Sequence, residues 1–243
     1  MQKLLSYTRR AVDHYHMIEA GDRIAVGVSG GKDSLALLTA LSGLRRFYPN
    51  PYEVVAITLE MGYAEMDFSP VQSLCDTLGV PYIRVPTQIK QIVFDVRQEE
   101  SPCSLCAKLR RGALHEAALA AGCKKVALGH HFDDVVETYM LSLMYEGRIS
   151  CFKPVTYLDR KGVTLIRPLI YTPEHFIRSF ARREALPIVE NPCPADGNTK
   201  RQEVKDLLKA LEQEHRGLRE RIFGAIQRYP LDGWAPDRTK YKD

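Results

Sequence analysis

The sequence predicts an α/β fold, an open, mostly parallel, doubly wound sheet followed by a C-terminal helical extension. Apolar strand-like segments alternate with helical segments of about a dozen residues, which is the pattern of parallel βαβ units. Residues 23–28 (RIAVGV) are apolar on both faces apart from Arg23, as expected for a strand buried within such a sheet. A glycine-rich turn follows this strand, and sheets of this class bind ligands beyond the carboxyl ends of their strands.

The first part of the chain supports this fold class element by element. Residues 3–20 carry apolar side chains near a 3.6-residue period, and Gly21 and Asp22 are expected to end that helix. After the strand at 23–28, apolar helices and short apolar strands follow in turn. We expect helices at 34–44, 70–78, 104–121 and 133–145, and further strands at 53–59, 81–85 and 125–128.

The alternation weakens after the last of these helices. Residues 151–170 are typical of a short hairpin, 173–185 of a helix, and 189–198 (VENPCPADGN) of a loop. Residues 199–227 form a long, strongly helix-forming stretch. The tail at 228–243 is polar, and we expect it to be partly disordered at its end.

Composition excludes several classes of protein. The chain has 243 residues, of which 45% are hydrophobic and 26% charged, and this balance is typical of a globular protein. It has neither the ~18 consecutive apolar residues that a membrane span needs nor a secretory signal, so we expect a soluble, cytoplasmic protein. The net charge of +4 permits an anionic partner such as nucleic acid without requiring one.

The turn after the first strand, residues 29–34 (SGGKDS), suits a phosphate group. Unpaired backbone N–H groups and the positive end of a helix dipole meet there. The glycines allow positive φ angles and close approach of a ligand, and the serine hydroxyls and the lysine add donors and charge. A turn that needs glycine for geometry alone is the alternative, but these polar side chains exceed what geometry requires. The residues of this site are Ser29, Gly30, Gly31, Lys32, Asp33 and Ser34.

Two common phosphate motifs do not match this turn. A Walker loop has a serine or threonine after its lysine and a glycine six positions before it, whereas Lys32 is followed by Asp33 and preceded at that distance by Val26. A dinucleotide fingerprint starting at Gly27 would need glycine two positions later, where Ser29 stands.

A second polar motif, residues 129–138 (GHHFDDVVET), also follows an apolar strand and opens a helix. Asp133 and Asp134 could simply cap that helix, and His130 and His131 could be ordinary loop residues. Beside a phosphate turn on a neighbouring strand, however, a carboxylate can hold Mg²⁺ against phosphate oxygens and a histidine can contact phosphate.

Six cysteines in a chain without an export signal are more typical of thiols or metal ligands than of a disulfide framework. Cys103 and Cys106 form a C-x-x-C, which could be two core cysteines, a redox dithiol or half of a metal site. Cys193, between two prolines, is a further thiol in a loop. Three thiolates can hold three irons of a cubane cluster and leave one iron open to an exogenous sulfur ligand. The remaining cysteines are expected to pack as small apolar residues, and they are Cys75, Cys123 and Cys151.

Taken together, these motifs resemble the tRNA 2-thiocytidine synthetase family of PP-loop ATP pyrophosphatases. The resemblance covers roughly residues 18–228 and preserves the order of the motifs. It rests on GDRIAVGVSGGKDSLALL, CSLCAKLRRGAL, GHHFDDVVET, LIRPLIY and NPCPADGNTKRQEVKDLL. It implies ATP, Mg²⁺, a 4Fe-4S cluster, and thiolation of a tRNA base after its carbonyl is adenylated, the base being cytidine 32 in the family's namesake.

The resemblance also assigns roles to individual residues. It implies that the cluster is bound by Cys103, Cys106 and Cys193. The implied catalytic residues are Asp33, Arg110 and Asp133. The implied nucleotide-binding residues are Ser29, Gly30, Gly31, Lys32, Asp33, Ser34, Gly129 and His130.

On this basis residues 1–175 would form the PP-loop ATP pyrophosphatase domain with its N-terminal helix. Residues 176–243 would form a helical extension packed on the same core that supplies the third cysteine. Expected partners are tRNA and a sulfur donor, either a cysteine desulfurase or free sulfide, with the chain as a homodimer. Several basic clusters could follow tRNA phosphates, among them Arg9–Arg10, Arg45–Arg46 and those around Lys108, Arg178 and Arg219.

Other functions remain compatible with the residues. A PP-loop tRNA ligase with an amine nucleophile, similar to lysidine synthetase, would leave the three cysteines without a role. A small-molecule sulfur transferase of the same fold and a metal-stabilised RNA-binding module without catalysis are further alternatives. The segment LEMGYAEMDFSP departs from the family's namesake, and the C-x-x-C pairs at the termini of the related 2-thiouridine synthetases are missing, which places the identity of the nucleoside in question.

Overall fold

The computed structural model describes residues 1–63, 65–97, 102–193 and 200–239. Its single sheet has the strand order β3-β2-β1-β4-β6-β5, and only the β5–β6 pair is antiparallel. The fold class predicted from the sequence is thereby confirmed. The strands are β1 Arg23–Gly27, β2 Glu53–Glu60, β3 Tyr82–Pro86, β4 Lys125–Ala127, β5 Val155–Leu158 and β6 Val163–Ile166.

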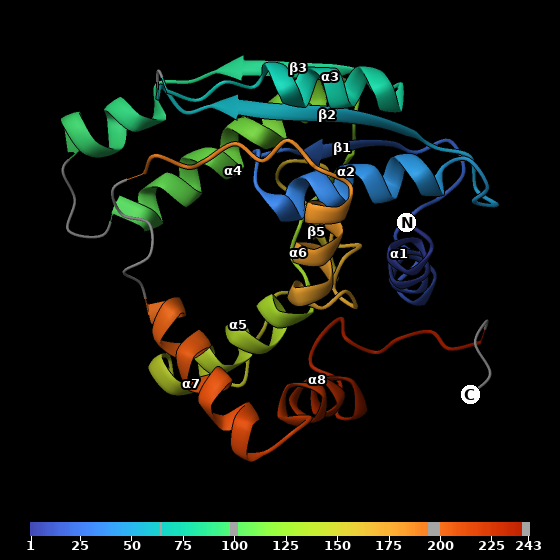
Figure 1. Cartoon of the computed structure of the whole chain (residues 1–243), viewed down its shortest axis with the longest axis vertical. Helices are drawn as coiled ribbons and strands as arrows, with labels where there is room; N and C mark the ends of the chain where they lie inside the picture. Colours follow the sequence, from blue (N-terminus) through green and yellow to red (C-terminus); the bar gives the residue numbers. More distant parts are fainter. Residues whose placement is uncertain (64, 98–101, 194–199, 240–243) are drawn as a thin grey trace.

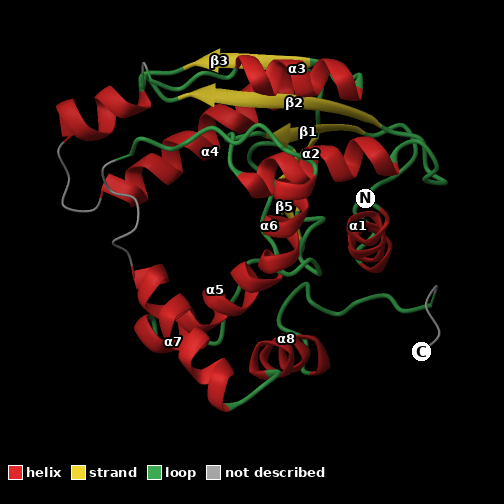
Figure 2. Cartoon of the chain, in the orientation of Figure 1, coloured by secondary structure: helices red, strands yellow, loops and turns green. Residues whose placement is uncertain are grey.

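Helices pack against this sheet, and the last two of them extend beyond it (Figure 2). Those of the first part are α1 Gln2–His14, α2 Lys32–Leu44, α3 Ser69–Leu78, α4 Pro102–Ala120 and α5 Phe132–Tyr145. Those of the second part are α6 Glu174–Arg183, α7 Lys200–Glu214 and α8 Leu218–Arg228. A short π-helical segment, η1 Gln91–Arg97, was not expected from the sequence. Within the described residues, no helix combines the length and the apolar character that a membrane span requires.

Alternate residues of the central strands face two separate cores. Ile24 and Val26 of β1 pack in the larger core with α1 and α2, whereas Ala25 between them packs in the smaller core with Ala118 of α4. All four side chains are fully buried. This arrangement explains why the strand is apolar at every interior position, because both of its faces are covered.

Two predicted helices end differently from expectation. The first stops at His14 instead of continuing to residue 20. The long helix predicted at 199–227 is two helices, because Gly217 adopts a left-handed conformation with a φ of 77°. The carboxylate of Glu212 accepts hydrogen bonds from the backbone N–H groups of Gly217 and Arg219, which stabilises this turn.

The C-terminal tail is packed onto the molecule as far as it is described. Trp234 is completely buried, and its indole N–H donates to the carbonyl of Phe152 at 2.9 Å. The Asp237 backbone N–H donates to the carbonyl of His14 at 2.8 Å. The last residues of the tail, 240–243, and the end of the predicted 189–198 loop lie outside the described residues.

Replacing Trp234 with alanine tests whether the tail belongs to the core. We expect Trp234→Ala to lower the free energy of unfolding by about 3–5 kcal/mol, because a large buried aromatic side chain is removed. Urea unfolding followed by circular dichroism measures the change. Tyr229→Ala is the control in the same tail, since that side chain is 84% exposed; an equal loss in both variants would contradict the packing described here.

Candidate functional site

The two polar motifs meet because the strands that precede them are neighbours. β1 and β4 pair in parallel, with Val26 opposite Ala127, so the turns after both strands lie at the same edge of the sheet. A Cβ atom on Gly129 would lie 3.1 Å from the carbonyl carbon of Asp33 and 3.2 Å from the backbone nitrogen of Ser34. Glycine at position 129 therefore allows the second motif to contact the backbone where α2 begins.

The glycine turn is held by its own serines. The Ser34 hydroxyl donates to the Gly31 carbonyl at 2.9 Å and accepts from the Ser29 backbone N–H at 3.2 Å. Gly30 has a φ of 85°, a conformation that other residues rarely adopt. Gly31 precedes α2 and has no side chain with which to cap the first N–H groups of the helix, so these donors can bind an anion.

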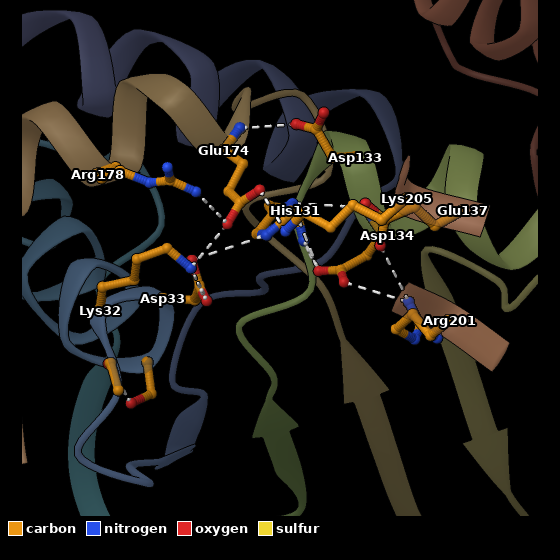
Figure 3. A network of polar contacts seen from close by, with 12 residues as sticks. Lys32, Asp33, His131, Asp133, Asp134, Glu137, Glu174, Arg178, Arg201 and Lys205 are labelled. Atoms are coloured by element: carbon orange, nitrogen blue, oxygen red, sulfur yellow. Dashed lines mark hydrogen bonds and ion pairs between the residues drawn. The ribbon is translucent and has the colours of Figure 1, made fainter. Parts of the chain in front are cut away.

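Lys32 and Glu174 form the centre of an ion-pair network at this edge (Figure 3). The Lys32 ammonium lies 2.9 Å from the Asp33 carboxylate and 3.1 Å from that of Glu174. Glu174 also binds Lys205 of α7 at 2.8 Å and Arg178 of α6 at 3.1 Å. Burial alone would raise the pKa of Glu174, but Lys205 and Lys32 outweigh burial and lower it, so Glu174 is ionised.

His131, rather than His130, faces the phosphate turn. Its Nε2 lies 3.7 Å from Oδ1 of Asp33, which is buried and has no hydrogen-bond partner among the described residues. His131 caps α5, since its Nδ1 accepts from the Asp134 backbone N–H while the Asp134 carboxylate accepts from the His131 backbone N–H. Because Nδ1 accepts, the neutral ring carries its proton on Nε2, directed at Asp33.

His130 lies among aromatic and basic side chains instead. Its ring centroid is 4.9 Å from that of Phe152, and burial lowers its pKa to about 4, with Arg167 acting in the same direction. A histidine with this pKa is neutral at pH 7 and can offer phosphate a hydrogen bond but no charge. Its predicted phosphate contact stays a prediction.

Asp133 uses both of its carboxylate oxygens within the protein. Oδ2 accepts from the Glu174 backbone N–H at 2.7 Å at the start of α6, and Oδ1 binds Arg219 of α8 at 2.9 Å. These bonds favour a structural role, in which Asp133 joins α5 to two later helices. Its predicted catalytic role is therefore without support from the geometry and stays a prediction.

The three predicted cluster cysteines approach one another. Cys103 and Cys106 lie on the first turns of α4, and Cys193 ends a segment that crosses the glycine turn, where the Val189 N–H donates to the Gly30 carbonyl at 3.0 Å. In Figure 1 this segment, drawn in orange after α6, passes across α4 in the view. Burial raises the pKa of Cys106, Arg110 offsets part of that effect, and the nearby Cys193 and Cys103 raise the pKa further.

Tyr63 is a neighbour of these thiols that the sequence did not reveal. Burial and a hydrogen bond with the Cys193 thiol raise its pKa to about 12, and Cys106 is close enough to add to the shift. The described residues contain no group of three or more His, Cys, Asp or Glu side chains already arranged around a metal position. Three neighbouring thiols are nevertheless the donor set that iron–sulfur clusters use, so the residues fit such a group.

A pocket of about 290 Å³ has neighbours of both parts of the site in its lining. It opens at the carboxyl ends of β2 and β3 and includes Phe68, which lies 3.3 Å from the position of a Cβ on Gly30. Its other side includes Tyr63, the partner of Cys193. The lining residues are Glu60, Met61, Gly62, Tyr63, Met66, Phe68 and Arg84.

Comparison with known proteins agrees with this geometry. Residues 4–211 match the PP-loop domain. The chain is 40% identical over 238 residues to the tRNA-cytidine(32) 2-sulfurtransferase of Geobacter sulfurreducens, covering 95% of this chain and 93% of that one. This protein belongs to the family of the PP-loop tRNA-cytidine(32) 2-sulfurtransferases. It is also 39% identical to the Teredinibacter turnerae member over 229 residues, 93% of this chain and 76% of that one.

The chain is also similar in structure to an iron–sulfur protein. The U34-tRNA thiolase NcsA from Methanococcus maripaludis, with its 4Fe-4S cluster, superposes with a TM-score of 0.73 at 26% sequence identity. The match covers 92% of this chain and 77% of that chain.

Several basic residues of this 2-sulfurtransferase family member, predicted to follow tRNA phosphates, have partners within the chain. Arg45 donates to the carbonyl of Leu78 at 2.7 Å, and the Arg10 guanidinium lies 4.4 Å from the ring centroid of Tyr171. Arg219 is only 14% exposed in its ion pair with Asp133. These side chains stabilise the fold, so net charge alone does not locate a tRNA-binding face.

Gly129→Ala tests the contact between the two motifs. We expect a loss of about 1–3 kcal/mol in stability and weaker ATP binding, because the added methyl group meets backbone atoms that cannot move aside. Urea unfolding and isothermal titration calorimetry measure the two effects. Gly112→Ala, with open space around the new Cβ, is the control; it should leave ATP affinity unchanged and should not lower stability, because alanine is more favourable than glycine inside helix α4. Equal ATP affinity in Gly129→Ala would contradict the contact.

Arg110→Met tests the electrostatics of the thiols in metal-free protein. Removing the guanidinium should raise the pKa of Cys106 further above its usual value, so less thiolate is present at pH 8 and iodoacetamide reacts more slowly there. Site-resolved mass spectrometry measures the rate. Arg111→Met, which removes the adjacent charge, should change it little; a faster reaction in Arg110→Met would refute the assignment.

Proposed function

We propose that this protein thiolates a cytidine of tRNA, with ATP activating the base carbonyl and an iron–sulfur cluster delivering the sulfur. One observation carries the proposal. A pocket at the carboxyl ends of β2 and β3 is lined both by Phe68, a neighbour of Gly30 in the glycine turn, and by Tyr63, a neighbour of Cys193 and Cys106. A nucleotide bound there would have its phosphates at α2 and its reactive end within reach of the cysteines.

The chain's own residues would activate the base. The carbonyl oxygen of the base attacks the α-phosphorus of ATP, and pyrophosphate leaves from the first turn of α2, where backbone N–H groups and Lys32 can stabilise its charge. Asp33, which has one buried oxygen without a hydrogen-bond partner among the described residues, would hold Mg²⁺ against the phosphates, and His131 would orient that carboxylate.

The second half of the reaction replaces the activated oxygen. Cys103, Cys106 and Cys193 would hold the cluster, whose open iron would supply a bound sulfur atom as the nucleophile. Arg110, which lies beside Cys106, would stabilise the negative charge that develops as adenosine monophosphate leaves.

The partners follow from this chemistry. We propose that the sulfur comes from a cysteine desulfurase or from free sulfide in the cytoplasm. We also propose a homodimer, because apolar side chains at the end of α5 and just after it are exposed to an extent that a second copy could cover. These side chains are Leu143, Met144, Tyr145 and Ile149.

Cys193→Ala separates thiolation from ATP use. We expect the anaerobically purified variant to lose the brown colour of the cluster and all formation of 2-thiocytidine, while ATP binding is retained because the glycine turn is intact. Nucleoside mass spectrometry of tRNA after incubation with ATP and sulfide measures the product.

Cys75→Ala is the control for that experiment, since this buried thiol lies in α3 away from the cluster residues. It should keep both colour and activity. A colourless wild-type protein that releases pyrophosphate and transfers an amine to tRNA would instead establish the amine-ligase alternative. Persistent 2-thiocytidine formation by Cys193→Ala would also overturn the proposal.

A further inference from the structure

The ammonium group of Lys32 is held by two carboxylates and still has a donor to spare. It lies 2.9 Å from Asp33 and 3.1 Å from Glu174. An ammonium group carries three N–H donors, so two of them can serve these carboxylates while the third is available to a phosphate oxygen. These two bonds, rather than the flexible lysine side chain, fix the position of the ammonium group relative to the glycine turn.

Glu174 is itself fixed from several directions (Figure 3). Its side chain is only 11% exposed, and its backbone N–H donates to Asp133 at 2.7 Å. Its carboxylate bridges Lys32 to Lys205 and also accepts from Arg178. Lys205 belongs to α7 and stands more than 150 residues after Lys32 in the sequence. Glu174 therefore links a C-terminal helix to the phosphate turn.

We propose that Glu174 is a positioning residue that holds Lys32 ready for phosphate, and that Lys205 makes this positioning depend on α7 being docked. The inference rests on the proposed use of ATP. It differs from a role in which Glu174 blocks the site, because the ion pairs made directly by Lys32 and Glu174 join three cations (Lys32, Arg178 and Lys205) to two carboxylates (Asp33 and Glu174), which leaves positive charge there for an anion.

The proposed dependence of nucleotide binding on the docking of α7 also acts in the opposite direction. If docking of α7 raises nucleotide affinity through Lys205 and Glu174, nucleotide binding must stabilise the docked α7 to the same extent. A phosphate that binds Lys32 in its held position therefore favours the docked helix, which begins shortly after the segment that carries Cys193.

Calorimetry with a non-cleavable nucleotide tests the positioning role. The probe is the α,β-methylene analogue of ATP with Mg²⁺, titrated into the full-length protein. We expect Glu174→Gln to bind about tenfold more weakly, since its neutral amide oxygen holds the Lys32 ammonium less strongly than a carboxylate does, and Lys205→Met about threefold more weakly. The double variant should bind no more weakly than Glu174→Gln alone, because both changes break the same connection.

Lys209→Met is the matched control. It removes the same charge from an exposed position one turn further along α7 and should leave affinity unchanged. Circular dichroism confirms that each variant is folded. Unchanged or tighter binding by Glu174→Gln, or additive effects in the double variant, would overturn the inference. Failure of the wild type to bind the probe would instead refute the proposed use of ATP.

Hydrogen exchange supplies a readout that a purely structural role would not change. In the wild type, the probe should slow amide exchange across α7, and in Glu174→Gln this protection should disappear although nucleotide still binds at raised concentration. Equal protection of α7 in both proteins at matched occupancy would show that Glu174 does not connect the two sites.

Discussion

The parallel pairing of β1 with β4 is the constraint on which the site depends. It places the ends of two strands that are separated by about a hundred residues of chain at one edge of the sheet, and Gly129 lets their turns touch. Without that contact, His131 would not reach Asp33, and the N-terminus of α2 would have no partner motif. The helices that follow both strands then point their positive ends toward the same space.

The C-terminal helices complete this edge rather than forming a separate unit. The first part of the chain supplies mostly carboxylates, and α7 and α8 supply the cations that balance them. Arg201 and Arg219 flank Glu137, which is 3% exposed and whose pKa burial raises. Removing these helices would leave buried acids without partners, which is far more costly than losing surface ion pairs. Ion pairs of the site therefore join residues on both sides of the proposed boundary at residue 175.

Patterns within short stretches of the sequence predicted the features that depend on neighbouring residues. The sheet and the glycine turn followed from apolar periodicity and from the donors of a strand-to-helix turn. The neighbourhood of the three cysteines, which joins distant segments, was expected from the family resemblance. Contacts between distant segments could not be predicted in the same way. Glu174 reads as an ordinary residue of the first helical turn, and only the packing of α6 and α7 brings it to Lys32. Between two adjacent histidines, the sequence offered no means of deciding which one faces Asp33; the capping geometry of α5 decides it.

The thiol site and the phosphate site differ in how their charges are stabilised before any ligand binds. At the phosphate turn, burial disfavours the charged forms of Glu174 and Lys32, but their opposite-charge partners outweigh it, lowering the pKa of Glu174 and raising that of Lys32, so both are ionised. At the cysteines, burial and the neighbouring thiols raise the pKa of Cys106, so the metal-free site favours protonated sulfur. If the proposed cluster binds here, its iron would have to displace protons, and Arg110 would lower the cost of forming the thiolate. The proposed phosphate site is thus organised by the fold itself, whereas the thiols only come near one another, and the proposed cluster would have to draw them into a ligand set.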